Sequence, residues 1–97
     1  MKKSKKKKAK YIVKRGKHAH TYDERKVYGS AYAACYIVML NHKQCERIAN
    51  NVAKKVTALV HKKKAVTSTH IFHHVTKELR KHSKNAAFMY ETHRDIA

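Results

Sequence analysis

Apolar residues recur at helical spacing through the middle of this chain, and this pattern constrains the fold more than any other feature. Within residues 24–40 they lie three or four positions apart, at Val27, Ala31, Ala34, Cys35 and Val38. A second run with the same period reaches about His61, at Ile48, Val52, Val56, Leu59 and Val60. Each run places an apolar stripe on a helix, which must be buried against another element. The sequence therefore predicts two consecutive helices, the first capped by Asp23 and the second opened by a capping box of Asn41 and Gln44.

Shorter patterns flank these two helices. Runs rich in β-branched and aromatic residues predict strands at residues 11–13, 18–22 and 65–66. Gly16 provides a turn between the first two strands. Two more helical runs follow. The hydroxyls of 67–69 precede a third helix that carries Ile71, Val75 and Leu79, and a turn or cap at 83–85 precedes a fourth helix over 86–93. The expected order is β-β-α-α-β-α-α, a small α+β domain.

The chain carries a large positive charge that is spread unevenly. Its 97 residues include 24 Lys and Arg but 6 Asp and Glu, so the formal net charge is +18. Residues 1–9 are mostly lysine, and we expect a disordered Lys-rich tail there and a folded domain over 10–97. Such a charge implies an anionic partner, which could be nucleic acid, acidic lipid or a polyphosphate. Apolar runs such as Tyr36–Leu40 are far shorter than the ~20 residues of a membrane span, and no signal peptide is visible. We therefore expect a cytoplasmic protein without a membrane partner.

Four short motifs share a family resemblance. They are Val13-Lys14-Arg15, Tyr22 to Val27, Val66-Thr67-Ser68 and His93-Arg94-Asp95-Ile96. Together they resemble the ATP-cone, the nucleotide-binding regulatory domain of ribonucleotide reductases and of the repressor of ribonucleotide reductase genes. The resemblance spans residues 10–97 and implies a small four-helix bundle capped by a three-stranded β-sheet. The sequence contains neither a zinc ribbon nor a reductase body, so we expect an ATP-cone that stands alone.

The resemblance also implies the ligand and its effect. Family members bind ATP or dATP, which Mg²⁺ could accompany, and they couple binding to self-association or to a protein partner. The implied nucleotide-binding residues are Ile12, Lys14, Arg15, Asp23, Lys26, Val27, Thr67 and Ser68. The expected function is therefore a nucleotide-responsive regulatory module and not an enzyme.

Four of these positions are implied to hold the phosphates, and a fifth is basic. Lys14, Lys26 and the pair Thr67-Ser68 match phosphate-contacting positions, and Arg15 matches the second basic position of the family. A triphosphate carries roughly four negative charges, so it favours several cations and the free amides of a helix N-terminus. In the absence of a nucleotide the same residues would be solvated charges and helix caps.

The remaining three positions are implied to hold the base and sugar. Ile12 and Val27 match positions that pack on the base, and Asp23 matches a position near the base and sugar. Ile12 and Val27 would be core residues in any fold, and Asp23 would cap a helix with or without a ligand.

Other chemistries have weaker support. His70 and His74 share a helical face, but a zinc site needs three or four ligands at compact spacing. Cys35 and Cys45 do not form a C-x-x-C motif. We therefore expect free thiols and no metal ligated by the protein. No Gly-rich phosphate loop or nucleophile motif is present. The alternative function is a small basic nucleic-acid-binding protein that contacts phosphates non-specifically through residues 1–10 and its basic surface.

Overall fold

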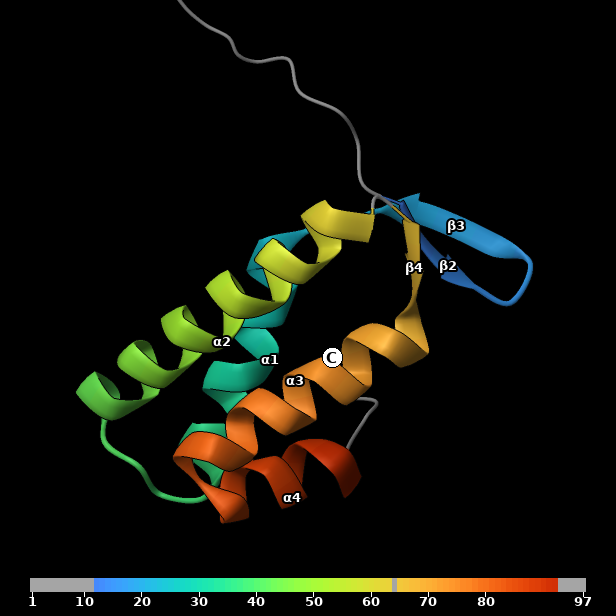
Figure 1. Ribbon diagram of the computed structural model, residues 1–97. Helices are drawn as coiled ribbons and strands as arrows, with labels where there is room; N and C mark the ends of the chain where they lie inside the picture. Colours follow the sequence, from blue (N-terminus) through green and yellow to red (C-terminus); the bar gives the residue numbers. More distant parts are fainter. Residues whose placement is uncertain (1–11, 64, 93–97) are drawn as a thin grey trace, which may run out of the picture.

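A computed structural model describes residues 12–63 and 65–92 of the chain, and the structural statements below concern this part. Three strands and four helices follow one another in it (Figure 1). They are β2 (Ile12–Arg15), β3 (His18–Thr21), α1 (Glu24–Ile37), α2 (His42–Lys63), β4 (Ala65–Thr67), α3 (Ser68–His82) and α4 (Lys84–Thr92). The predicted order of an α+β domain is thus confirmed, whereas the expected tail over 1–9 lies outside the described residues.

The strands form one mixed sheet in the order β3-β2-β4. β2 pairs antiparallel with β3 and parallel with β4. Gly16 has a φ of 60°, which suits the first central position of a two-residue hairpin loop and favours glycine there. In Figure 1 the hairpin of β2 and β3 projects beyond the helices, whereas β4 lies on the side of the sheet next to them.

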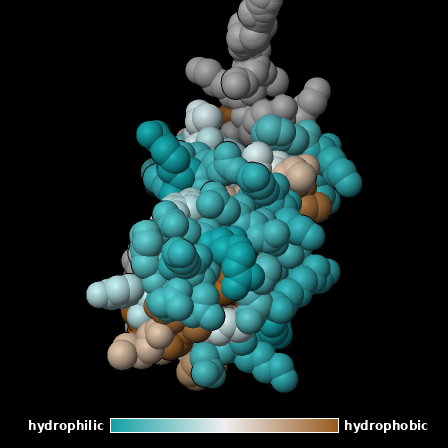
Figure 2. Space-filling model, turned by 90° about the vertical axis from the view of Figure 1, so that its left-hand side faces the viewer, coloured by the Kyte–Doolittle hydropathy of each residue, from teal (hydrophilic) through white to brown (hydrophobic). Residues whose placement is uncertain are grey.

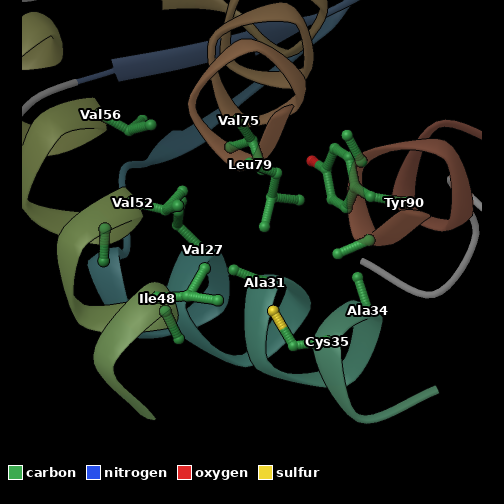
Figure 3. Close-up of a cluster of buried hydrophobic side chains, with 14 of the residues drawn as sticks. Val27, Ala31, Ala34, Cys35, Ile48, Val52, Val56, Val75, Leu79 and Tyr90 are labelled. Atoms are coloured by element: carbon green, nitrogen blue, oxygen red, sulfur yellow. The ribbon is translucent and has the colours of Figure 1, made fainter. Parts of the chain in front are cut away.

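The core lies between the four helices and one face of the sheet. Val13 and Val66 are paired in register and are both buried, so this face of the sheet packs inward. Figure 3 shows the helical part of the core, where residues of α1 and α2 meet Val75 and Leu79 of α3 and Tyr90 of α4. Alanines that are completely buried, such as Ala31 and Ala34, allow the helices to approach closely. The apolar stripes that predicted the helices are therefore the surfaces that form the core.

Local hydrogen bonds confirm the predicted helix starts. Asp23 Oδ1 accepts from the Arg25 amide at 2.9 Å, as an N-cap does. Asn41 and Gln44 exchange side-chain to backbone bonds of 2.9 and 3.2 Å, which is the capping box.

The end of α1 differs from the prediction. The helix ends at Ile37 and not at residue 40, because Met39 adopts a left-handed conformation with a φ of 72°. The Leu40 amide then donates to the Cys35 carbonyl at 3.1 Å and the Met39 amide donates to the Tyr36 carbonyl at 2.9 Å, which is a Schellman motif.

α4 begins at Lys84, two residues before the predicted start. Ser83 caps it, with its Oγ accepting from the Ala86 amide at 3.0 Å, so the cap expected within 83–85 is present. None of the described helices has both the length and the apolar character that a membrane crossing requires.

Candidate functional site

Lys14 of β2 and Thr67 of β4 lie opposite each other in the parallel pair. Paired residues of neighbouring strands project from the same face of a sheet, so both side chains leave the sheet on one side, and both are exposed. Ile12 lies two residues before Lys14 on the same face of β2 and is half-buried. The sheet thus brings a cation, a hydroxyl and an apolar side chain onto one face, opposite to the face of the buried Val13.

Thr67 also begins α3. It is the N-cap of this helix, and its Oγ1 accepts from the His70 amide at 3.0 Å. Ser68, the first residue of α3, is half-buried, and the first turn of the helix carries no acidic residue. The start of a helix has backbone amides that no helical bond uses and a partial positive charge. Lys14 therefore lies beside a second source of positive potential.

Ala19 of β3 pairs with Lys14 from the other side. Its methyl group is small, so it leaves the exposed Lys14 side chain free to turn toward a ligand. The sequence analysis did not single out Ala19. The alternation of His18, Ala19 and His20 was the available signal, because it places the small residue in the same row as Lys14 once the hairpin register is known.

The other expected residues lie at the start of α1. Lys26 is exposed in the first turn of this helix. Asp23 has its pKa lowered, chiefly by the hydrogen bond from the Arg25 amide and further by the positive charges of Arg25 and Lys26. Val27 is only 6% exposed and packs into the core, as Figure 3 shows. A base could therefore contact the edge of Val27 at most.

The two helix starts lie on opposite sides of β2. α1 follows β3, whose last residue Thr21 pairs with Ile12, whereas α3 follows Thr67, which pairs with Lys14. Ile12 and Lys14 are about 7 Å apart along the strand. The sheet therefore brings Lys14 and Thr67 directly together and places the start of α1 nearer to Ile12. Arg15 ends β2, and its side chain lies outside the described part.

One polar contact of this region has no counterpart in the sequence analysis. Tyr22, between β3 and α1, has its hydroxyl 2.8 Å from that of Thr57 on α2. Burial raises the pKa of Tyr22, and the bond to Thr57 partly opposes this effect. The residues are 35 positions apart, so no local pattern could reveal the pair.

The described residues contain no group of three or more His, Cys, Asp or Glu that could hold a metal ion. His74, which shares a face with His70, has its pKa lowered by burial and then by the nearby charge of Lys77. Cys35 and Cys45 are buried free thiols, and burial raises the pKa of each.

No family model, no curated protein and no solved structure matches this chain.

Proposed function

We propose that this domain binds ATP or dATP at the face of the sheet that carries Ile12, Lys14 and Thr67, and that the bound nucleotide shifts an assembly equilibrium. The observation that supports the proposal is the parallel register, which pairs Lys14 with the N-cap of α3. An ammonium group and a helix N-terminus side by side favour a phosphate more than either does alone.

The phosphates occupy the Lys14 end of this site. Lys14 contacts a phosphate oxygen, and the first turn of α3 with Ser68 provides amides and a hydroxyl. As the resemblance implies, Lys26 and Arg15 add two further cations, Lys26 from the start of α1 on the other side of β2, and Mg²⁺ accompanies the nucleotide. No acidic residue in the first turn of α3 opposes the negative charge.

The base occupies the Ile12 end. Ile12 is half-buried and offers an apolar surface on the same face as Lys14. Asp23, held as a carboxylate by its hydrogen bond from the Arg25 amide, lies near this end because α1 follows the strand residue paired with Ile12. Its free oxygen accepts a hydrogen bond from the sugar or the base amino group.

The nucleotide acts as a signal in this proposal. Binding offsets the positive charges of Lys14, Arg15 and Lys26. It shifts self-association or partner binding if the two assembly states bind the nucleotide with different affinities. The reaction class is ligand binding without bond formation, so no residue is assigned a catalytic role.

Calorimetry of the whole chain with ATP and with dATP, in the presence of Mg²⁺, tests the proposal. We expect saturable micromolar-range binding that falls at least about tenfold in Lys14→Ala/Lys26→Ala, equivalent to ~1.4 kcal/mol. Lys77→Ala/Lys84→Ala is the matched control, because it removes the same charge from exposed positions of α3 and α4. An equal loss in both variants, or no saturable binding by the unaltered chain, contradicts the proposal. A mass measurement with and without nucleotide then tests the shift in assembly.

A further inference from the structure

The exposed side of α2 carries five cations that the nucleotide site does not use. They are Lys43, Arg47, Lys54, Lys55 and Lys62, all exposed, and we call them the α2 stripe. At ~3.6 residues per turn they fall within about 120° of the helix circumference. From the first to the last they extend about 28 Å along the helix, at a rise of ~1.5 Å per residue. The one acid of α2, Glu46, lies outside this arc and contacts His42 at 3.4 Å.

None of the five cations forms an ion pair with any residue in the described part of the chain. Two cations of α3 differ in this respect, since Arg80 contacts Glu91 at 3.6 Å and Lys81 contacts Glu78 at 3.4 Å. The α2 stripe therefore gathers five cations without an ion pair on one side of a single helix, and their charge is available to an external anion.

Helix stability does not account for the stripe. Lys62 is near the C-terminus of α2, where a cation favours the helix dipole, but Lys43 is in the first turn, where it does not. Lys43 and Arg47 are four residues apart and repel each other. An acid in place of Lys43 would favour both the helix dipole and the neighbouring Arg47. The stripe therefore has the character of a binding surface.

The composition of this surface distinguishes between anionic partners. Figure 2, which views the molecule from the α2 side of Figure 1, shows a mainly hydrophilic surface there. The large exposed apolar residues Tyr36, Ile37, Met39 and Phe88 belong to other parts of the structure. The stripe therefore lacks both the apolar anchors of a membrane-surface helix and the aromatic rings that stack on single-stranded bases. Cations distributed along about 28 Å of one side of a helix instead suit a duplex, which presents closely spaced phosphates along its whole length.

We propose that the α2 stripe binds the phosphate backbone of a nucleic-acid duplex without reading its sequence. Each Lys or Arg neutralises one phosphate and releases counterions, and the helix keeps the five side chains on one side of α2. This surface lies on a different element from Lys14 and Thr67, so the inference does not depend on the proposed nucleotide site.

The test is the salt dependence of duplex binding by the whole chain. A labelled duplex of mixed sequence is titrated at several KCl concentrations, and the logarithm of the affinity is plotted against that of the salt concentration. DNA and RNA duplexes are measured in parallel to show which backbone is preferred. We expect the slope of Arg47→Gln/Lys54→Gln to become shallower by about 1.8, at ~0.9 per lost phosphate contact. Lys17→Gln/Lys84→Gln removes the same charge away from the stripe and should leave the slope unchanged.

The matched pair also separates the stripe from the remaining charge of the chain, because any contribution of residues 1–10 is the same in both variants. Equal slopes for the two variants would overturn the proposal, since duplex binding would then follow overall charge. Binding to phosphatidylserine vesicles that is as tight as duplex binding and is lost in Arg47→Gln/Lys54→Gln would also overturn it. Lys14→Ala/Lys26→Ala should retain duplex binding, so failure of the nucleotide proposal leaves this test intact.

Discussion

The hydroxyl of Tyr22 lies 2.8 Å from the hydroxyl of Thr57 and joins the segment between β3 and α1 to α2. Both side chains are half-buried. Thr57→Val keeps the shape of this side chain but leaves Tyr22 without its partner. We expect the free energy of unfolding, measured by urea denaturation, to fall by about 1 kcal/mol. Thr57→Ser keeps the hydroxyl, so its free energy of unfolding should fall less. If Thr57→Val were as stable as the unaltered chain, the hydrogen bond would contribute nothing to stability.

The same pair predicts a change in titration. Burial raises the pKa of Tyr22 above 10.0, and the bond to Thr57 opposes that rise. Thr57→Val removes the opposing effect, so the pKa of Tyr22 should rise further. Because the folded pKa is above the unfolded one, the stabilisation is complete below 10.0 and is lost as pH increases through the folded value. Phenolate absorbance during an alkaline titration measures the shift, and an unchanged or lowered pKa would be inconsistent with the bond.

Cys35 predicts a second alkaline effect. It is completely buried, and burial, followed by the neighbouring Cys45, raises its pKa from 9.0 to about 11. The neutral thiol therefore stabilises the fold fully below 9.0 and loses this contribution as pH rises through about 11. Urea unfolding over this range should show a steeper loss of stability in the unaltered chain than in Cys35→Ala. Identical pH dependence in the two proteins would refute the assignment.

Met39 predicts a stabilising substitution. It adopts a left-handed conformation with a φ of 72° in the Schellman motif after α1, where helices usually place glycine. This conformation costs a residue with a side chain about 1 kcal/mol. Because Met39 is 88% exposed, its side chain contributes little packing. Met39→Gly should therefore raise the urea midpoint of unfolding without changing the slope of the transition. A lowered midpoint would mean that the Met39 side chain makes a contact that stabilises the fold.

The sequence predicts the parts of this fold that depend on local pattern. The apolar periods of α1 and α2 identify both helices, and Asp23 identifies the first cap, because amphipathic spacing and capping act over a few residues. The end of α1 was predicted three residues too late. Met39 carries no glycine signal, and the hydrogen bonds of the Schellman motif determine where the helix stops.

The contacts that form the candidate site join residues far apart in the sequence. The pairing of Lys14 with Thr67 depends on how α1 and α2 return the chain to β2, which no local pattern encodes. The buried position of Val27 shows the same limit, since a core residue and a base-contacting residue have the same apolar character. Helical spacing alone could have identified the α2 stripe. The sequence, however, led us to expect nucleic-acid contact mainly through residues 1–10.

The most direct test of the central claim is a titration of the ¹⁵N-labelled chain with ATP, monitored residue by residue through its amide resonances. Our account predicts saturable shifts concentrated at Ile12, Lys14, Thr67 and Ser68, which are lost in Lys14→Ala/Lys26→Ala. Shifts that do not saturate, or that are confined to residues 43–62 of α2, would contradict the claim that the paired strands form a nucleotide site.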